Sequence, residues 1–378
     1  ILLLVGSALA LLAWLAVLSA PHQPHRARER LEADPAAADD LSSVNVLIPA
    51  RDEAAVIGRT VAALHAQGRR LEVVVIDDQS SDDTRGAATR VARPDLPLRV
   101  LAGRPLPEGW AGKLWALEQG LAVVERPYVL LLDADIELAP HTVPALLAAA
   151  LERDATLVSL LAELHCTTLW EKLLSPAFVL FFKLLYPFAW SNDARKATAA
   201  AAGGCMLVRT DVLREIGGFA AIRGALIDDC TLAAALKHSR PPIWLGMTHS
   251  VRSLRVYATL DDFWRMVSRS AFTQLRYSTA WLLAATLLMG VTLLVPVAGV
   301  AAGIVAGDRW LLASAAAAWL ATGAVYWPVV AFYRLSPAWA ATLPVAAVLF
   351  LAMTWSSAIG YWRGTRASWK ARDYARPS

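Results

Sequence analysis

Between residues 44 and 132 the chain alternates short apolar runs with stretches of helical character, and this alternation constrains the fold more than any other feature. Four runs have the length and composition of buried strands: 44–48, 73–76, 98–101 and 129–132. Three stretches between them predict helices: 54–66, 83–91 and 113–124. This order predicts an α/β domain with a doubly wound, mixed but mainly parallel sheet that binds ligands at the carboxyl ends of its strands.

Apolar residues outside this region form segments long enough to cross a membrane. Hydrophobic residues make up 57% of the sequence and the mean hydropathy is +0.44, both high for a soluble enzyme. We predict an N-terminal transmembrane helix at 1–20 and a linker at 21–43, with a cleaved signal peptide as the alternative for 1–20. We also predict C-terminal membrane helices within 279–362, which divides into three apolar segments: about 279–305, 310–333 and 338–362.

Positive charge beside these segments gives conflicting evidence on topology. Arg26, Arg28 and Arg30 follow the first segment and place the next domain in the cytoplasm. Three further spans would then put the basic tail, 363–378, on the other side, although basic tails prefer the cytoplasm. Either one C-terminal segment is re-entrant or interfacial, or the charge rule is broken. The prolines in the last segment, at positions 337 and 344, make it the segment that we expect to be irregular.

The aromatic segment 168–190 is interrupted by two prolines and carries two lysines. We predict that it lies at the membrane interface, with a full span and a buried core helix as alternatives. The net charge of +4 lies largely near the apolar segments, which favours contact with anionic lipid. The middle domain lacks a basic stripe interleaved with aromatics, so we expect no nucleic-acid binding. Cys166, Cys205 and Cys230 are widely spaced, and we interpret them as reduced core thiols, with a disulfide or zinc site as the alternative.

Polar residues follow the predicted strands at the edge where a doubly wound sheet binds ligands. The first strand is followed by Pro-Ala-Arg-Asp-Glu at 49–53, and the second by Asp-Asp-Gln-Ser-Ser-Asp-Asp-Thr at 77–84. A capping box, in which Ser80 or Ser81 caps the following helix, explains the end of the second motif. It does not explain the carboxylates at 77 and 78, which can accept hydrogen bonds from a nucleobase or a ribose.

The fourth strand ends in Asp-Ala-Asp at 133–135, two carboxylates on a tight turn that suit a divalent ion carrying a diphosphate. Lys113 stands at a helix N-terminus, where it opposes the helix dipole unless an anion binds there; a solvated surface lysine is the alternative. Gly203 and Gly204 permit close approach of a ligand or form a tight packing turn. The two carboxylates at 228–229 begin a helical stretch, where one suits an N-cap and the other a general base.

Taken in order, these motifs resemble those of the family 2 glycosyltransferases of the GT-A fold, and the resemblance covers roughly 44–278. The apolar ends of the chain and the Gln-Leu-Arg-Tyr-Ser run at 274–278 are most similar to the hopanoid-biosynthesis-associated glycosyltransferases of bacteria. The chain is more distantly similar to ceramide glucosyltransferases. The Trp-Lys-Ala-Arg-Asp-Tyr run at 369–374 also resembles a tail of lipid-modifying relatives, with alanine in place of glycine.

The resemblance implies a role for each matching residue. Asp229 would be the base that deprotonates the acceptor hydroxyl. Asp135 would bind Mg²⁺ or Mn²⁺ directly, and Asp133 would approach both ribose and metal. The residues implied to bind the nucleotide sugar are Pro49, Ala50, Glu53, Asp78, Lys113 and Asp133. Those implied on the acceptor side are Gly203, Gly204 and Asp228, and those considered for a lid are Arg265, Arg269, Gln274 and Arg276.

The resemblance therefore implies a membrane-anchored inverting glycosyltransferase, multi-pass in the bacterial inner membrane, with a cytoplasmic catalytic domain. It would transfer a sugar from a nucleotide diphosphate sugar to the hydroxyl of a lipid such as a hopanoid. Two departures matter: the family's Glu-Asp pair is Asp-Asp here, and the Gln-x-x-Arg-Trp motif of processive synthases has no clear copy. A processive polysaccharide synthase and an inactive membrane scaffold with this fold are the alternatives.

Overall fold

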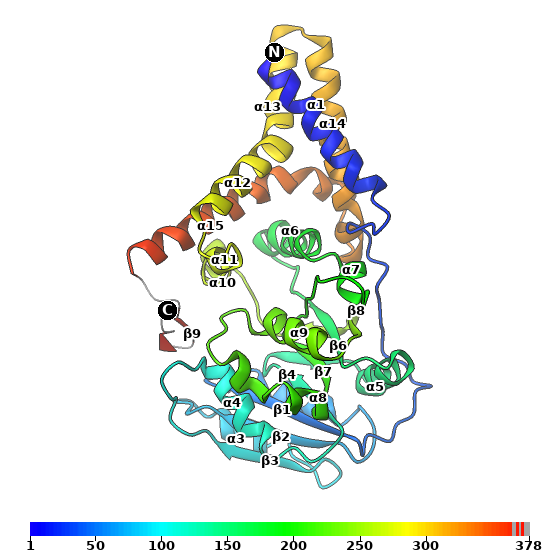
Figure 1. Cartoon of the computed structure of the whole chain (residues 1–378), viewed down its shortest axis with the longest axis vertical. Coiled ribbons are helices and arrows are strands. Elements are labelled where there is room, and N and C mark those ends of the chain that lie inside the picture. Colours follow the sequence, from blue (N-terminus) through cyan, green and yellow to red (C-terminus); the bar gives the residue numbers. More distant parts are fainter. Residues whose placement is uncertain (365–367, 370–371, 374–378) are drawn as a thin grey trace. The chain divides into compact units, whose positions relative to one another are not determined.

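The computed structural model describes residues 1–364, 368–369 and 372–373, which divide into two compact units (Figure 1). The α/β unit comprises Glu29–His165, Trp190–Val256 and the described residues 368–369 and 372–373, and the helical unit comprises Ile1–Arg28, Cys166–Ala189 and 257–364. Much of the predicted basic tail (365–367, 370–371 and 374–378) lies outside the described residues, and with it part of the 369–374 motif. Within that tail, Ser368–Trp369 (β9) and Arg372–Asp373 (β10) pair as antiparallel strands.

The α/β unit is built on an eight-stranded sheet in the order β3-β2-β1-β4-β7-β6-β8-β5. Strands β1 to β4 pair in parallel, β7 is antiparallel to both of its neighbours, and β5 is antiparallel to β8. This mixed, mainly parallel sheet confirms the predicted fold class. The strands are β1 (Val44–Ala50), β2 (Glu72–Asp77), β3 (Leu98–Ala102), β4 (Tyr128–Leu132), β5 (Ile136–Leu138), β6 (Leu157–Glu163), β7 (Cys205–Arg209) and β8 (Ile243–Ser253).

Helices cover both faces of this sheet because the buried strands alternate their side chains between two apolar clusters. Val46, Ile48 and Leu130 belong to the cluster that packs against α2 and α5, while Leu47 and Leu131 belong to the cluster that packs against α4 and α9. The helices in the α/β region of the chain are α2 (Ile57–Leu64), α3 (Thr84–Thr89), α4 (Gly112–Leu121), α5 (Thr142–Arg153), α7 (Phe188–Asn192), α8 (Thr210–Glu215), the 3₁₀ turn η1 (Gly218–Ile222) and α9 (Asp228–Ser239).

The helical unit holds the long apolar helices. Four helical segments of the described chain have the length and composition needed to cross a membrane: Leu2–Ser19, Thr279–Ala306, Arg309–Phe332 and Pro337–Trp362. These agree with the four apolar segments predicted from the sequence. The elements of the unit are α1 (Leu2–Ser19), α6 (Leu169–Leu185), α10 (Leu260–Ser268), α11 (Ala271–Gln274), α12 (Thr279–Met289), the π-helical η2 (Gly290–Leu294), α13 (Val295–Ala306), α14 (Arg309–Phe332), the 3₁₀ turn η3 (Pro337–Thr342) and α15 (Leu343–Trp362).

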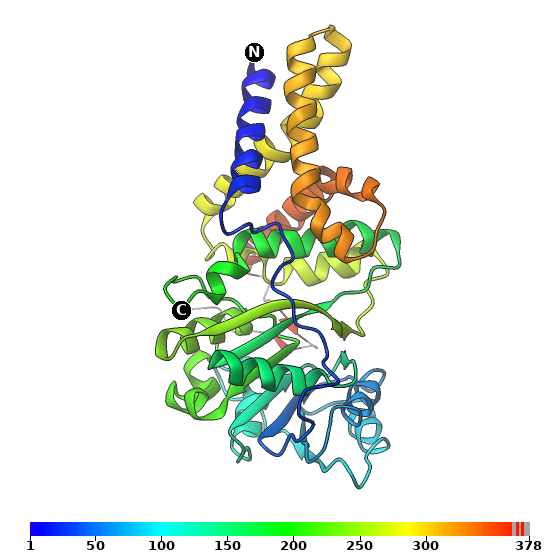
Figure 2. The same cartoon turned by 90° about the vertical axis from the view of Figure 1, so that its right-hand side faces the viewer.

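Helices α1, α13 and α14 lie side by side in both views (Figures 1 and 2). Small residues bring their backbones together: a Cβ added at Gly299 would lie 2.8 Å from Ser7 Oγ and 2.9 Å from Ala315 Cβ. The indole of Trp14 on α1 also donates to the backbone oxygen of Thr292 in η2, at 2.9 Å. Close packing through small residues is typical of helices that associate within a membrane.

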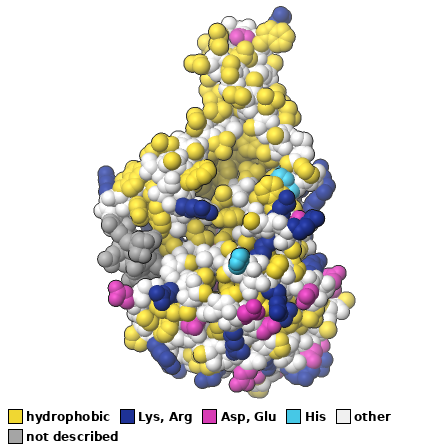
Figure 3. All heavy atoms as spheres, in the orientation of Figure 1, with side chains coloured by type: hydrophobic (Ala, Val, Ile, Leu, Met, Phe, Trp, Pro, Cys, Tyr) yellow, Lys and Arg dark blue, Asp and Glu magenta, His cyan; other side chains and the backbone are white. Residues whose placement is uncertain are grey.

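The visible surface of the helical unit is mostly hydrophobic, whereas charged side chains gather over the α/β unit (Figure 3). The last helix of the helical unit, α15, runs across the direction of the α1–α13–α14 bundle (Figures 1 and 2). Pro337 begins the 3₁₀ turn before it and Pro344 lies in its first turn, where the missing N–H costs no helical hydrogen bond. The two prolines thus coincide with a change of chain direction, and a re-entrant or interfacial placement of the last segment remains a prediction.

The aromatic segment 168–190 forms α6 followed by the start of α7. Thr168 caps α6 in a capping box with Glu171, and Pro176 lies inside the helix. Within the helical unit, Phe178 and Phe181 of α6 pack against the ring of Phe350 on α15. Helix α6 is therefore partly buried inside its own unit, and its place at the membrane interface remains a prediction.

Candidate functional site

Loops from five strands of the sheet converge on one edge of the α/β unit. β1, β2 and β4 end there with the motifs at 49–53, 77–84 and 133–135, because their strands are parallel. β7 is antiparallel to β4, so the glycines that precede β7 lie at the same edge. β8 also ends there, since β5 begins directly after the turn at 133–135 and pairs antiparallel with β8. The candidate site residues of the α/β unit are thus brought together as the parallel-sheet rule requires.

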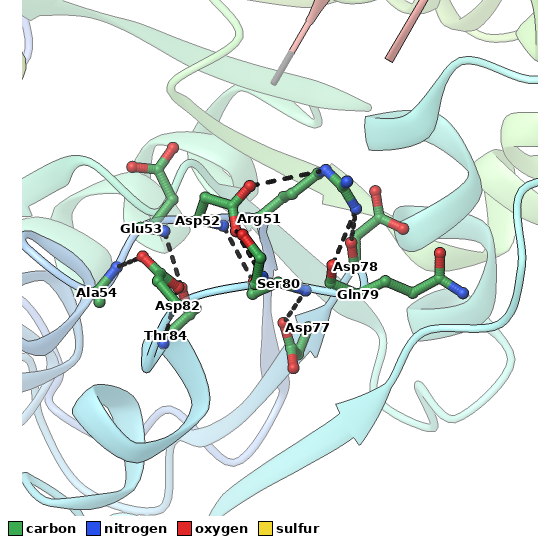
Figure 4. A network of polar contacts seen from close by, with 11 residues as sticks. Arg51, Asp52, Glu53, Ala54, Asp77, Asp78, Gln79, Ser80, Asp82 and Thr84 are labelled. Carbon is green, nitrogen blue, oxygen red and sulfur yellow. Dashed lines mark hydrogen bonds and ion pairs between the residues drawn. The ribbon is translucent and has the colours of Figure 1, made fainter. Parts of the chain in front are cut away.

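The first two motifs are joined by a polar network (Figure 4). The Arg51 guanidinium donates to the backbone oxygens of Asp78 and Gln79, at 2.6 and 3.0 Å. The backbone N–H of Asp52 donates to Ser80 Oγ at 3.0 Å, and its carboxylate accepts from the N–H of Ser81 at 2.7 Å. Asp52 and Gln79 have φ of +52° and +57°, a region that non-glycine residues rarely adopt, so these contacts hold two strained turns.

The capping box expected for the helix after β2 is wrong. Neither serine caps α3: Ser81 donates both its N–H and its hydroxyl to Asp52, and the N-cap residue of α3 makes no side-chain cap bond. Instead, the Asp82 carboxylate accepts the N–H groups of Thr84 and Ala54. The motif is used to tie two loops together, because the left-handed turn at Asp52 brings a competing acceptor to Ser81.

Lys113 is the central cation of the site. It lies in the first turn of α4, with Nζ 2.8 Å from Asp133 Oδ1 and 3.2 Å from Asp228 Oδ2. Burial disfavours the charged form, but the two carboxylates outweigh it and raise the pKa of Lys113. Burial also raises the pKa of Asp133. The positive charge of Lys113 opposes this increase, whereas repulsion from Asp135 and Asp228 adds to it. The alternative of a solvated surface lysine is excluded, since the Lys113 side chain is only 19% exposed.

Asp229 lies in the first turn of α9 and faces the loop before β7. Its carboxylate accepts the backbone N–H of Gly203 at 3.0 Å and that of Cys230 at 2.7 Å. Burial, and then the neighbouring charge of Asp228, raise the pKa of Asp229 to about 6. Neither aspartate is the N-cap of α9, because the helix begins at Asp228 and follows Ile227, so the N-cap interpretation is wrong for both.

The two glycines before β7 differ in what surrounds them. A Cβ added at Gly203 would lie 3.3 Å from Asp229 Oδ2 and 3.4 Å from Lys113 Nζ, so only a glycine leaves these groups undisturbed. A Cβ at Gly204 would instead lie 3.0 Å from the side chain of Ile136, in the core. The glycine that permits groups of the site to approach the backbone closely is therefore Gly203, whereas Gly204 allows the chain to pack against Ile136 in the core.

Asp135 pairs with a residue that the sequence did not indicate. Arg255 follows β8 and places its Nε 2.8 Å from Asp135 Oδ2 and its Nη2 3.2 Å from Glu53 Oε1. Residues 243–253 have no pattern from which we predicted a strand, so nothing in the sequence indicated a cation at this edge. Arg51 was present in a motif but had no assigned role, because its partners are backbone oxygens of the next loop.

The carboxylates at 133 and 135 suit a hard divalent cation. Each now faces a cationic nitrogen at 2.8 Å, so each already compensates a positive charge. Among the described residues, no group of three or more His, Cys, Asp or Glu side chains is placed to hold a metal. One or two carboxylates completed by phosphate oxygens are the usual ligand set of Mg²⁺ in nucleotide sites, so Asp133 and Asp135 fit an ion that arrives with a diphosphate.

The remaining candidate residues fall into two groups. Pro49 and Ala50 lie at the end of β1, and Asp78 follows β2 with only 1% of its surface exposed. The residues considered for a lid belong to the helical unit, where Arg265 pairs with Asp261 and Asp262, and Gln274 Nε2 donates to the Tyr186 hydroxyl. The lid role of Arg265, Arg269, Gln274 and Arg276 remains a prediction.

The cysteines are free thiols, as expected, and none forms a disulfide. Cys205 and Cys230 are buried, and burial raises the pKa of both, to about 12 for Cys205, which makes them unreactive. Cys166 is only partly buried, so the expectation of a core thiol does not hold for it.

The comparisons with known proteins agree with this geometry. The family model described as Glycosyl transferase family 2 matches residues 45–217. An undecaprenyl-phosphate 4-deoxy-4-formamido-L-arabinose transferase from Klebsiella pneumoniae is 32% identical over 116 residues, 29% of this chain and 34% of that protein. A beta-monoglucosyldiacylglycerol synthase from Trichormus variabilis is 33% identical over 111 residues, 28% of this chain and 23% of that protein. The matched stretch thus spans about a third or less of the length of these relatives.

A solved structure extends the likeness of the fold to most of the chain. A mannosyltransferase from Pyrobaculum calidifontis, in complex with GDP-Man and Mn²⁺, aligns with 94% of this chain and 99% of its own, at 18% identity and a TM-score of 0.54. At this identity the likeness concerns the fold alone. Residues 45–217 thus match the model of glycosyl transferase family 2, and they lie in a mixed, mainly parallel sheet that is typical of the GT-A fold.

Proposed function

We propose that this chain is a membrane-anchored, inverting glycosyltransferase that moves one sugar from a nucleotide diphosphate sugar to the hydroxyl of a lipid. The observation that carries the proposal is the convergence of Asp133, Lys113 and Asp229 at one sheet edge, with Lys113 paired to Asp133. This arrangement combines groups for an anionic donor with a carboxylate whose raised pKa suits proton abstraction. Asp135 and Asp133 are the residues that would hold Mg²⁺ or Mn²⁺ together with the diphosphate of the donor.

Two further observations support a lipid acceptor. The relatives with matching segments include proteins named for undecaprenyl phosphate and for a glucosyldiacylglycerol. Four helical segments of the described chain are long and apolar enough to cross a membrane, which would hold the enzyme at the surface where lipids reside. We place the enzyme in a bacterial inner membrane with its α/β unit in the cytoplasm, and a hopanoid is the acceptor class that we propose first.

In the proposed reaction Asp229 removes the proton of the acceptor hydroxyl, and the oxygen attacks the anomeric carbon on the face opposite the diphosphate. The backbone N–H of Gly203 holds the Asp229 carboxylate in place. Lys113 attracts the donor diphosphate at the N-terminus of α4, where the helix dipole adds to its charge. A bound divalent ion would neutralise the charge that develops on the leaving diphosphate.

The test is product formation from defined donors and lipids. Membranes containing the chain are incubated with a panel of radiolabelled nucleotide sugars, with a hopanoid, diacylglycerol or undecaprenyl phosphate added, and the lipids are extracted and separated. We expect one labelled lipid that carries a single sugar on its hydroxyl, which disappears with Asp229→Asn, whereas label on undecaprenyl phosphate would indicate a phosphate acceptor and contradict the proposed hydroxyl. A product with many sugars would indicate a processive synthase, and no labelled lipid from any pair would contradict the proposed activity.

A further inference from the structure

Arg255 joins two carboxylates that come from different strand ends. Its guanidinium bridges Glu53, which follows β1, and Asp135, which follows β4. Both acids are largely buried, with side chains 11% and 15% exposed, whereas Arg255 is 36% exposed. Two buried carboxylates at one edge need a cation, because an uncompensated buried charge is costly. In this structure the Arg255 guanidinium compensates the negative charge of both carboxylates.

The backbone of Arg255 is fixed at the turn that carries Asp135. The N–H of Leu254 donates to the backbone oxygen of Asp135 at 2.7 Å, and the N–H of Arg255 donates to Ser253 Oγ at 3.2 Å. Ile136, directly after Asp135, is the register partner of Ser253 in the β5–β8 pair. Only the side chain of Arg255 can therefore leave Asp135 without disrupting the sheet.

A divalent ion at Asp135 would meet this guanidinium. Like charges at contact distance repel strongly in a partly buried site, so the ion and the Arg255–Asp135 contact compete for one carboxylate. A donor diphosphate changes the balance, because its negative charges can compensate both cations at once. Ion binding and nucleotide binding are then coupled, and each strengthens the other by the same factor.

We propose that Arg255 is a resident counter-cation of the donor site, which holds Asp135 and Glu53 until a divalent ion and a nucleoside diphosphate displace it together. The inference rests on the proposed function and deepens it. It states that the cation that compensates Asp135 and Glu53 changes from Arg255 to the divalent ion when the donor binds. Arg255 acts as a positioning residue in the ion-free protein, and it keeps the ion site weak until a diphosphate is present.

The chain provides a matched control. Arg252 lies only three residues earlier, in β8, and pairs with Glu163 at 3.7 Å. Arg252→Gln removes the same charge as Arg255→Gln from the same part of the chain, yet it leaves the Asp135 contact intact. Arg255→Lys keeps the charge but loses the fork that contacts two carboxylates, which separates charge from geometry.

The experiment measures Mn²⁺ binding by the full chain in detergent, from the electron paramagnetic resonance signal of free Mn²⁺, without nucleotide and with UDP or GDP. Without nucleotide, Arg255→Gln is expected to bind Mn²⁺ roughly 3- to 10-fold more tightly than the wild type, the effect of one neighbouring charge on a carboxylate. Arg252→Gln is expected to match the wild type within about twofold, the range expected for a screened surface charge. The gain in Mn²⁺ affinity on adding nucleotide is expected to be smaller in Arg255→Gln.

Thermal unfolding provides a second readout that does not depend on turnover. Without Mn²⁺ the Arg255→Gln chain is expected to unfold at a lower temperature than the wild type, and Mn²⁺ is expected to restore part of the difference. Equal Mn²⁺ affinities in the wild type, Arg255→Gln and Arg255→Lys would overturn the inference while leaving the donor site intact. Absence of Mn²⁺ binding in every variant, with either nucleotide, would overturn both the inference and the proposed metal-dependent donor site.

Discussion

The carboxylate of Asp229 accepts the backbone N–H of Gly203 at 3.0 Å, so the first turn of α9 and the loop before β7 meet at one hydrogen bond. This contact fixes the carboxylate that we propose as the base and places Lys113 beside the same glycine. The proposed acid–base chemistry and the proposed donor contacts are thereby linked through a single backbone position, and the first two predictions test that link.

Transfer should depend on the ionised form of Asp229. Burial and the charge of Asp228 raise its pKa to about 6, so the fraction able to accept a proton increases as the pH rises through that value. We expect kcat/KM to rise between about pH 5 and about pH 7 and then to level off. Asp229→Asn should lower transfer by about 10²- to 10⁴-fold while nucleotide binding, measured by calorimetry, is retained.

The matched control for this prediction is Asp193→Asn. Asp193 is an acid of the α/β unit whose partner is Arg195, and that contact lowers its pKa to about 2. Its variant should keep the wild-type rate and pH profile. Transfer at a near wild-type rate by Asp229→Asn would show that another group is the base.

Gly203→Ala should reduce activity without unfolding the chain. The added Cβ would lie 3.3 Å from Asp229 Oδ2, so the carboxylate has to shift by a few tenths of an ångström. We expect a loss of transfer of about tenfold, because small displacements of a reacting group are costly in rate, with little change in unfolding temperature. Gly290→Ala, where a Cβ would meet no atom within 4 Å, is the control. Equal rates for both variants would contradict the close approach at Gly203.

Lys237→Met should destabilise the α/β unit. The Lys237 ammonium donates to the backbone oxygens of Trp190, Ser191 and Thr198 at 3.1, 2.6 and 2.7 Å, and it is buried. Methionine fills the same space but removes the Lys237 donor from all three oxygens, at a cost of about 2–4 kcal/mol. Chemical denaturation followed by intrinsic fluorescence measures the effect. The exposed Lys196→Met serves as the control, and equal midpoints for the two variants would rule out this role.

Glu171→Gln should destabilise the helical unit in a pH-dependent way. The Glu171 carboxylate accepts the N–H groups of Thr167, Thr168 and Tyr257 at 2.9–3.0 Å. Burial opposes ionisation of Glu171, but these hydrogen bonds outweigh it and lower its pKa from 4.5. The ionised group therefore stabilises the fold above about pH 4.5, and this stabilisation is lost as the pH falls through the lowered pKa.

We expect Glu171→Gln to cost about 1–2 kcal/mol at neutral pH, as for other capping groups, and less in acid. Thermal unfolding at about pH 7 and about pH 4 measures the difference from the wild type. The control is Glu152→Gln, whose side chain is 75% exposed and pairs with its neighbour Arg153. A difference between Glu171→Gln and wild type that stays constant with pH would contradict the assigned ionisation.

The first half of the α/β unit was predictable because local pattern and topology act together there. The runs that become β1, β2 and β4 are mostly apolar and largely buried, as strands covered on both faces must be, and parallel pairing then gathers their polar ends. Asp133 and Lys113 were therefore recognisable from the sequence, whereas Asp229, on α9, was indicated by the carboxylate pair at 228–229 and by the family resemblance. Strands β5 to β8 were not assigned, because short apolar runs there have no period that distinguishes strand from helix.

The contacts of Arg255 and Arg51 depend on tertiary structure and could not be predicted. Glu53 is 202 residues away from Arg255, and no sequence motif links the two. The error at Ser81 has a similar origin, since a capping box is a local pattern, whereas Asp52, 29 residues earlier, offers a competing acceptor. Local rules failed where a loop from another strand supplies the hydrogen-bond partner.

The bond between Trp14 and Thr292 has a consequence for biosynthesis. It joins α1 to the π-helical segment η2, 278 residues later, and the two long stretches of the α/β unit, Glu29–His165 and Trp190–Val256, are encoded between these two positions. At ordinary translation rates the first helix waits on the order of tens of seconds for the helices that pack against it. During that interval it must be kept soluble or inserted alone, so we expect yield in cells to depend on how the nascent chain is handled, and not only on the final stability of the fold.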